Sequence, residues 1–197
     1  MRLYLASTSP RRSDLLRRAG YVFDCVPPGV EPADPGAPAS VAAERARAKC
    51  LGARVPATAP AGLVLGVDTV VDLDGRELGK PRDRADARSM LMALAGAEHT
   101  VHTAHCLRWH PVGAGGSAEV FERTSAARVR IRSLAAGEVE AYLDTGDWRD
   151  KAGGYGIQSM TGSFCTLLSG HEGTVIGLDV EALAALCRQA ASGPAPP

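Results

Sequence analysis

The 197-residue sequence lacks several features that would place it in a familiar class. Its 22 basic and 22 acidic residues cancel, so no global positive field recruits nucleic acid or an anionic membrane. Its five cysteines are odd in number and form no C-x-x-C pair, which argues against a disulfide framework and a zinc knuckle. Apolar runs are too short for a membrane span or a signal peptide. We therefore expect a soluble, cytoplasmic protein with reduced cysteines, no nucleic-acid partner and no membrane association.

Lysine is also scarce. Of the 22 basic residues 19 are arginines, which leaves Lys49, Lys80 and Lys151. A lysine presents a compact ammonium where an arginine presents a planar fork, so each remaining lysine is a candidate for a site that needs a point charge. All three fall in helix-terminal or Gly/Pro-punctuated segments near candidate anion sites. For Lys49 an alternative remains, because a lysine near a helix C-terminus also complements the helix dipole.

The first sixteen residues organise the rest of the chain. Residues 3–6 read as a short buried strand, residues 7–9 as a turn, and Pro10 as the first position of a helix capped by Ser9. The free amides of the first helical turn point outward together with the positive end of the helix dipole. Such an end attracts anions.

Two arginines stand where the helix dipole disfavours them. Arg11 and Arg12 lie in the first turn, although local helix stability would favour acidic residues there. The alternative is that both are solvated surface residues. The hydroxyls of Ser7 and Ser9 converge on the same point, however, and arginine forks match phosphate geometry. We therefore expect a phosphate at this turn.

Hydrophobic periodicity and turn residues predict one domain over residues 1–191, followed by a disordered tail over residues 192–197. Its 45% apolar content is enough for one core, arranged as one unit or as two lobes beside a cleft. The predicted strands cover residues 3–6, 21–26, 63–73, 77–81, 99–109, 120–133, 163–168 and 173–177. The predicted helices run from Pro10 to Gly20, from a Ser40 cap to Leu51, from Asp83 to Gly96, over residues 138–143 and from an Asp179 cap to Cys187, with loops at residues 27–38 and 113–118.

A carboxylate sits in the middle of the most convincing buried strand. Asp68 is surrounded by Val, Leu and Gly, and an ionised group is costly to bury there unless a cation or hydrogen-bond donors meet it. We favour a catalytic or metal-binding role, and a structural carboxylate that accepts backbone amides is the alternative. The nearby run from Asp72 to Gly75 lacks the remaining ligands of a calcium loop, which excludes that site.

Two irregular segments add polar candidates. Glu31 follows a strand in the Pro/Gly-rich loop, where it either reaches a metal or substrate or stays a solvated loop charge. Small residues around Tyr155 let the backbone approach a flat ligand closely, and Gln158 offers a donor and an acceptor that match the edge of a nucleotide base.

Binding arithmetic shows why several cations are needed. Micromolar affinity takes about 8 kcal/mol, whereas one charge-assisted hydrogen bond nets roughly 1.5–3 kcal/mol. The two arginines and three lysines together could hold a triphosphate. An unperturbed aspartate, with a pKa of about 3.9, is a weak base at neutral pH, but Mg²⁺ or Mn²⁺ bound by Glu31 and Asp68 would activate the attacking water. The expected reaction is cleavage between the α and β phosphates.

Four motifs, in order along nearly the whole chain, resemble those of the Maf family of nucleotide pyrophosphatases. They are Leu5-Ala6-Ser7-x-Ser9-Pro10-Arg11-Arg12-x-x-Leu15-Leu16, Gly66-x-Asp68-Thr69-Val70-Val71, Gly79-Lys80-Pro81 and Asp150-Lys151-Ala152-Gly153-x-Tyr155-Gly156-Ile157-Gln158. The resemblance implies an α/β fold of the Maf/Ham1, ITPase-like type. In that fold an elongated mixed β-sheet is flanked by helices, two lobes surround a deep cleft, and the chain often forms a homodimer.

The resemblance also implies roles for individual residues. Asp68 matches the family's proton acceptor. Positions tied to substrate choice are matched by Arg11, Thr69 and Gln158, and the polar site is matched by Ser9, Arg12, Glu31, Lys49 and Lys80. The Tyr-Gly-Ile-Gln version of the last motif resembles the branch that acts on dTTP and UTP.

Small departures and two rival functions remain. Gly154 replaces the usual Ala, Asp179 stands where a Pro often follows Gly-Leu, and the loop over residues 113–118 is longer, but no charged site residue is lost. One rival is a nucleotide-binding regulator of cell division that does not hydrolyse its ligand. The other is a pyrophosphatase for 7-methyl-GTP or another modified purine nucleotide.

Overall fold

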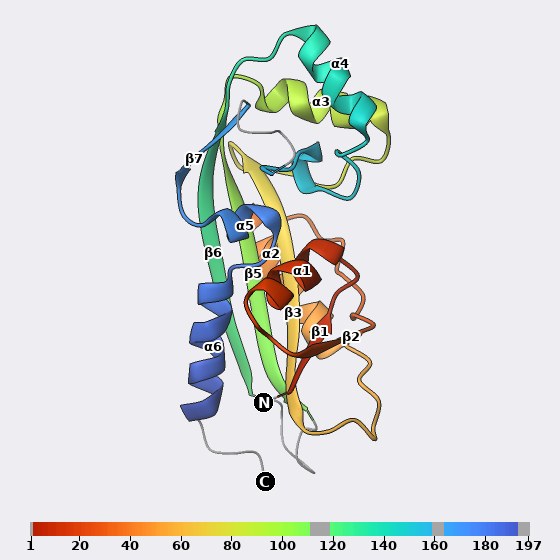
Figure 1. Ribbon diagram of the computed structural model, residues 1–197, viewed down its shortest axis with the longest axis vertical. Helices are drawn as coiled ribbons and strands as arrows, with labels where there is room; N and C mark the ends of the chain where they lie inside the picture. The colour runs from red at the N-terminus through yellow and green to blue at the C-terminus, as the bar shows by residue number, and fades with distance from the viewer. Residues whose placement is uncertain (1, 111–118, 159–163, 193–197) are drawn as a thin grey trace.

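The computed structural model describes residues 2–110, 119–158 and 164–192, and its centre is a seven-stranded mixed sheet in the order β2-β1-β3-β5-β6-β7, with β4 paired to β3 (Figure 1). The strands are β1 (Arg2–Ala6), β2 (Phe23–Val26), β3 (Gly62–Leu73), β4 (Arg76–Leu78), β5 (Glu98–His110), β6 (Val120–Ile131) and β7 (Cys165–Ser169). The helices are α1 (Pro10–Arg18), α2 (Pro38–Leu51), α3 (Arg84–Leu94), α4 (Ala136–Thr145), the 3-10 turn η1 (Ala152–Gly154), α5 (Glu172–Ile176) and α6 (Val180–Ser192). The predicted elongated α/β fold with a mixed sheet is confirmed.

Three long antiparallel strands give the molecule its length. β3 pairs with β5 over eleven residues, from Gly62 to Asp72, and β5 pairs with β6 over a similar stretch. β1 and β2 run parallel to β3 at one end only, and helices α3 and α4 cap the other end (Figure 1). Within the described part of the chain, no helix combines the length and the apolar character that a membrane span requires.

The apolar core divides into clusters that correspond to two lobes. At one end, Leu65 and its neighbours pack against α1 and α6 on one face of the sheet, while Val64 and its neighbours pack against α2 on the other face. At the other end, Val71 joins a separate cluster with the apolar faces of α3 and α4. Because β3 is covered on both faces, it reads as a nearly continuous apolar run, which is the pattern that identified it in the sequence.

Two predicted elements differ from the structure. The second helix begins at Pro38, not at a Ser40 cap, because a proline at the first helical position brings a fixed φ and has no amide to satisfy. Residues 173–177, for which the sequence predicts a strand, instead belong to the short helix α5 and its end, where the Gly177 amide donates to the Gly173 carbonyl at 2.8 Å. The β-branched run from Thr174 to Ile176 favours a strand locally, but the contacts of Thr174 override that preference.

Several boundaries shift by a few residues. The second strand begins at Phe23, β6 ends at Ile131, and α6 continues through Ser192, beyond the predicted end at Cys187. The cap of α6 is confirmed, since Asp179 Oδ1 accepts hydrogen bonds from the amides of the next turn. The predicted loop over residues 113–118 and the rest of the predicted tail, residues 193–197, lie outside the described residues.

Helix α2 packs against β3 at a position that admits only glycine. A Cβ atom on Gly66 would lie 2.2 Å from the Ala46 carbonyl oxygen and 2.6 Å from the Cys50 amide nitrogen. Real Cβ atoms do not approach backbone atoms this closely, so the helix and the strand would have to separate. Gly66 therefore sets the distance between β3 and α2.

We expect Gly66→Ala to lower the free energy of unfolding by about 1–3 kcal/mol or more, the cost of overpacking a close-packed interface. Gly137→Ala is the matched control, because a methyl group added at Gly137 would meet nothing within 4 Å and alanine favours helices. Urea unfolding followed by circular dichroism measures both. Equal stability of the two variants would contradict this account of the interface.

Two histidines are buried in neutral form. Burial lowers the pKa of His99 and of His105 to about 4. His99 Nε2 lies 2.5 Å from the hydroxyl of Tyr155, and His105 Nε2 accepts a hydrogen bond from the Asp179 amide at 3.1 Å. Protonation of His105 would therefore remove the acceptor for the amide at the start of α6.

Stability should fall as pH drops from about 6.5 to 4. In this window the unfolded chain binds protons at His99 and His105 while the folded chain does not, so protons favour unfolding. Each histidine contributes up to about 3 kcal/mol across the window. Thermal unfolding as a function of pH should show a shallower slope for His105→Gln than for wild type. The exposed His171→Gln is the control, and an unchanged slope in His105→Gln would contradict the prediction.

Candidate active site

The candidate site occupies a gap in the sheet beside β3. On this side of β3, pairing with β1 ends at Gly66, opposite Ala6, and pairing with β4 starts at Val71, opposite Leu78. In the described part of the chain, the stretch of β3 over residues 67–70 has no strand partner along this edge. Asp68 and Thr69, whose side chains point to opposite faces of this stretch, can therefore line the same cavity.

A cavity of about 530 Å³ fills this gap between the two lobes. All of the predicted site residues lie on its wall except Ser7. Those on the wall are Ser9, Arg11, Arg12, Glu31, Lys49, Asp68, Thr69, Lys80, Lys151 and Gln158. The sequence motifs, which are far apart in the chain, thus meet in one place.

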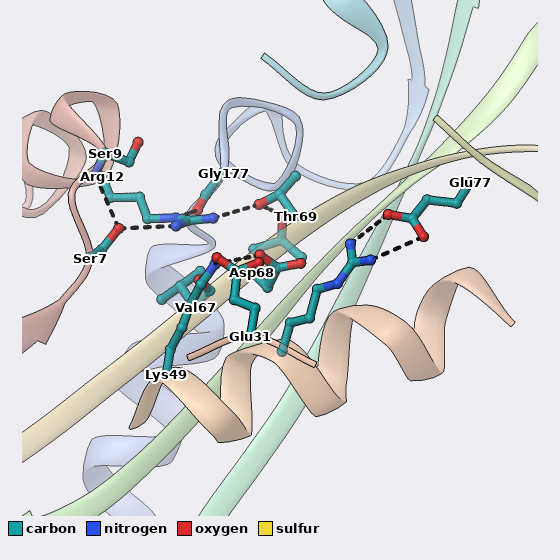
Figure 2. Close-up of polar contacts among 12 residues, drawn as sticks. Ser7, Ser9, Arg12, Glu31, Lys49, Val67, Asp68, Thr69, Glu77 and Gly177 are labelled. Carbon is teal, nitrogen blue, oxygen red and sulfur yellow. Dashed lines mark hydrogen bonds and ion pairs between the residues drawn. The ribbon is translucent and has the colours of Figure 1, made fainter. Parts of the chain in front are cut away.

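Asp68 faces α2 and meets a lysine there. Lys49 Nζ donates to Asp68 Oδ1 at 2.6 Å and lies 3.0 Å from Glu31 Oε1 (Figure 2). The side chains of Lys49 and Asp68 are 8% and 9% exposed, whereas that of Glu31 is 48% exposed. A buried carboxylate needs such a partner, because an uncompensated charge in this position is strongly destabilising. Lys49 is therefore the cation that the buried carboxylate of Asp68 requires.

Thr69, the next residue, faces the opposite layer and meets an arginine. Arg12 Nη2 donates to Thr69 Oγ1 at 3.3 Å, Nη1 donates to Ser7 Oγ at 3.0 Å, and Nε donates to the Gly177 carbonyl at 2.9 Å (Figure 2). Burial lowers the pKa of Arg12, and the negative charge of Asp68 opposes that shift. Ser7 thus lies behind Arg12 as its support and not on the cavity wall.

The backbone at Gly177 is shaped around this arginine. Gly177 has φ +124°, a conformation that side chains rarely adopt, and a Cβ there would lie 3.3 Å from Thr69 Oγ1 and 3.8 Å from Arg12 Nε. Its amide closes the last turn of α5 on the Gly173 carbonyl, and its own carbonyl accepts from Arg12 Nε. Three separate segments of the chain therefore fix the orientation of Arg12.

A second group of cations also lines the cavity. Arg11 Nη2 donates to the Asp150 carbonyl at 2.7 Å, and Lys151 Nζ contacts the Asp147 carbonyl. Burial lowers the pKa of Lys151, and the positive charge of Arg11 lowers it further. Lys80 lies at the mouth of the cavity and is exposed. Cations held this close to one another favour an anionic ligand between them.

The remaining wall is less polar. The ring of Tyr155 is buried and its hydroxyl contacts His99, so it forms a rigid surface, and Ile157 and Val175 lie beside it. Gln158 is exposed at the end of this wall. A flat ring with a polar edge fits such a surface.

Comparison with known proteins places the chain in a family. The family model for Maf-like proteins matches residues 2–190. The chain belongs to the Maf family. Its relatives include the dTTP/UTP pyrophosphatase of Bordetella avium, which is 41% identical and covers 96% of this chain and 95% of its own length. The dTTP/UTP pyrophosphatase of Thermococcus gammatolerans is 40% identical over 91% of each chain.

Similarity to solved structures is more distant. The crystal structure of a nucleoside-triphosphatase, or dITP/XTP pyrophosphatase, from Mycobacterium abscessus is 17% identical and covers 96% of this chain and 94% of its own, with a TM-score of 0.36.

Sequence reasoning missed an ion pair on the wall of this Maf-family cavity. Arg45 of α2 binds Glu77 of β4, with Nη1 to Oε1 at 2.5 Å and Nη2 to Oε2 at 3.3 Å. The helical spacing of Arg45 and Lys49, four residues apart on one face, was the signal that could have identified the arginine. No local signal connects Arg45 to Glu77, because 32 residues separate them.

The residues fit a divalent metal in one respect. Among the described residues, Asp68 Oδ2 is a buried oxygen without a hydrogen-bond partner, so it has free acceptor capacity. No group of three or more metal-ligating side chains forms in the described ranges. Mg²⁺ often binds through one or two carboxylates together with substrate phosphates, and Asp68 with Glu31 matches that smaller donor set.

A buried threonine links α5 to the arginine on the same face of the sheet. Thr103 donates its proton to the Thr174 carbonyl at 2.7 Å, so the Thr69 hydroxyl, 3.0 Å away, must donate to Thr103 Oγ1. Thr69 Oγ1 in turn accepts from Arg12. The chain of hydrogen bonds thus joins α5 to the arginine through β5 and β3.

We expect Thr103→Val to lower the free energy of unfolding by about 1–3 kcal/mol, because it leaves two buried polar groups without their partner. Thr103→Ser keeps the hydroxyl and is the matched control. Urea titration gives both values, and a Val variant as stable as the Ser variant would contradict the role assigned to this hydroxyl.

Proposed function

We propose that this chain is a nucleoside triphosphate pyrophosphatase that hydrolyses dTTP and UTP between the α and β phosphates, releasing the monophosphate and pyrophosphate. The observation that carries the proposal is the 2.6 Å contact between Asp68 and Lys49 on the wall of a cavity that also holds Arg11 and Arg12. The names of the relatives support the same reaction and the same pyrimidine substrates.

The cations bind the phosphates in this scheme. Arg12, fixed by three hydrogen bonds, and Lys49 neutralise the phosphates next to the scissile bond, where negative charge develops. Arg11, Lys80 and Lys151 reach the ligand from elsewhere on the cavity wall. Ser9 contributes a hydroxyl at the N-terminus of α1, and Ser7 acts through Arg12.

Asp68 acts as the proton acceptor. Lys49 occupies Oδ1, which leaves Oδ2 free to accept a proton from a water molecule. The oxygen of that water attacks phosphorus as the P–O bond of the α–β bridge breaks, and pyrophosphate leaves. Glu31 and Asp68 would hold a Mg²⁺ or Mn²⁺ ion, which supplies charge neutralisation and a more acidic bound water. Lys49 also holds Glu31 and Asp68 within reach of each other.

The less polar wall selects the base. Tyr155 and Ile157 offer a flat apolar surface, and the amide of Gln158 can both donate and accept a hydrogen bond, as the edge of uracil or thymine requires. The Thr69 hydroxyl donates to Thr103 and accepts from Arg12, so it keeps one lone pair that can accept from the base. Arg11 donates to the Asp150 carbonyl, at the start of the segment that carries Tyr155 and Gln158, so this phosphate-binding arginine is also coupled to the wall that selects the base.

The wider organisation is also proposed. Residues 1–191 act as one domain, with two apolar clusters at the β1 end of the sheet and a third at the end covered by α3 and α4. The protein works in the cytoplasm on a small-molecule substrate, without nucleic acid or membrane, and assembles as a homodimer.

The decisive assay measures pyrophosphate release from a panel of nucleotides with Mg²⁺ or Mn²⁺. We expect activity on dTTP and UTP, and we expect Asp68→Asn to reduce it by roughly 10²–10⁴-fold, the usual contribution of a general base. Asp72→Asn is the matched control, because Asp72 lies on the same strand but contacts Gly75 and His102 instead of the cavity.

Three outcomes would contradict the proposal. Nucleotide binding with no release by the wild type would favour the non-hydrolysing regulator. Release from 7-methyl-GTP or another modified purine nucleotide in preference to UTP would favour the purine enzyme. An Asp68→Asn variant as active as wild type would remove the proposed base.

A further inference from the structure

The Arg45–Glu77 pair lies on the cavity wall but has no role in the reaction proposed above. The side chains of Arg45 and Glu77 are 20% and 27% exposed. In the described part of the chain, every other arginine–carboxylate ion pair includes an arginine that is at least 45% exposed. Exposed pairs contribute little to stability, so their geometry matters little. A partly buried, bidentate pair such as Arg45–Glu77 instead fixes the orientation of the guanidinium.

Arg45 lies one helical turn from the lysine that meets Asp68. Arg45 and Lys49 are four residues apart on α2, so they project from the same face about 6 Å apart along the helix axis. Burial alone would lower the pKa of Arg45, but the hydrogen bonds and charge of Glu77, together with the charges of Asp68 and Glu31, raise it. Arg45 is therefore within electrostatic reach of both acidic groups of the site.

The guanidinium has donors to spare. An arginine carries five N–H groups, and two of them serve the oxygens of Glu77. The remaining N–H groups are enough for a further anion. Arg45 can thus hold Glu77 and a phosphate at the same time, with Glu77 keeping the fork in place.

The spacing of Lys49 and Arg45 along α2 matches the spacing between the scissile bond and the terminal phosphate of a nucleoside triphosphate. With the scissile bond at Asp68 and Lys49, the phosphates beyond that bond continue away from the nucleoside. A step of one helical turn is a distance that two linked phosphates can span. The alternative role for the pair is a purely structural tie between α2 and β4.

We infer that Arg45 binds the terminal phosphate of the nucleoside triphosphate and that Glu77 is the residue that positions it. The inference rests on the proposed function and deepens it, because it divides the cavity into a half that holds the departing pyrophosphate and a half that holds the monophosphate. Arg45 then favours triphosphates over shorter nucleotides.

The two products test this division separately. Isothermal titration calorimetry with Mg²⁺ measures the binding of pyrophosphate and of UMP to the wild type, to Arg45→Leu and to the matched control Arg47→Leu. Arg47 is on the same helix but pairs with Glu122, away from the cavity. We expect Arg45→Leu to weaken pyrophosphate binding by roughly 10- to 100-fold, as for one charge-assisted contact, with UMP binding unchanged within about twofold. Arg47→Leu should change neither.

Further variants separate positioning from folding. The double variant Arg45→Leu/Glu77→Leu replaces the ion pair by apolar side chains and leaves no unpaired charge, so it should fold and still bind pyrophosphate weakly. Glu77→Gln should weaken pyrophosphate binding by less than Arg45→Leu does. Arg45→Lys, which keeps the positive charge, should bind pyrophosphate more tightly than Arg45→Leu and less tightly than the wild type.

Two results would overturn the inference. If Arg45→Leu binds pyrophosphate as tightly as the wild type, Arg45 does not contact the terminal phosphate. If a folded Arg45→Leu variant loses affinity equally for pyrophosphate and UMP, the pair acts only as a structural tie between α2 and β4. The proposed function fails separately, if the wild type releases no pyrophosphate from UTP. Binding of the products would still decide the role of Arg45 in that case.

Discussion

The structure depends on a gap in the hydrogen bonding along one edge of β3. Between Gly66, the last residue paired with β1, and Val71, the first paired with β4, the strand borders a cavity instead of a neighbouring strand. Successive residues of a strand point to opposite faces, so Asp68 turns to α2 and Thr69 turns to α1. Each meets a cation from its own layer, Lys49 or Arg12. Two helices on opposite faces of the sheet thereby supply one site.

The packing around this gap keeps its charges in place. Gly66 lets α2 approach β3 closely, so the lysine near the end of that helix reaches the carboxylate on the strand. On the other face, the Gly177 carbonyl and the hydroxyls of Ser7 and Thr69 hold the guanidinium of Arg12. Such fixed donors need little reorganisation when charge develops on a ligand, which is the condition for electrostatic stabilisation of a transition state.

The sequence predicted the parts whose signal is local. A carboxylate in an apolar run, a proline-started helix with two arginines and scarce lysines in punctuated segments identified Asp68, Ser9, Arg11, Arg12, Lys49, Lys80 and Lys151 on the cavity wall. Thr69 was identified only through the resemblance to the family. Pairings between distant segments left no such signal, so the contact of Arg45 with Glu77 and the gap beside β3 could not be predicted. The β-branched residues of α5 favour a strand, and only the buried hydrogen bonds of Thr174 explain why they form a helix.

The most direct test of the central claim is a crystal structure with a UTP analogue whose α–β bridge carries nitrogen in place of oxygen, together with Mg²⁺. The account predicts the α–β bridge beside Asp68 and Lys49, with the guanidinium of Arg12 on the adjacent phosphate and the base against Tyr155. A triphosphate bound outside the gap beside β3, or a bridge on the opposite side of the cavity from Asp68, would contradict it.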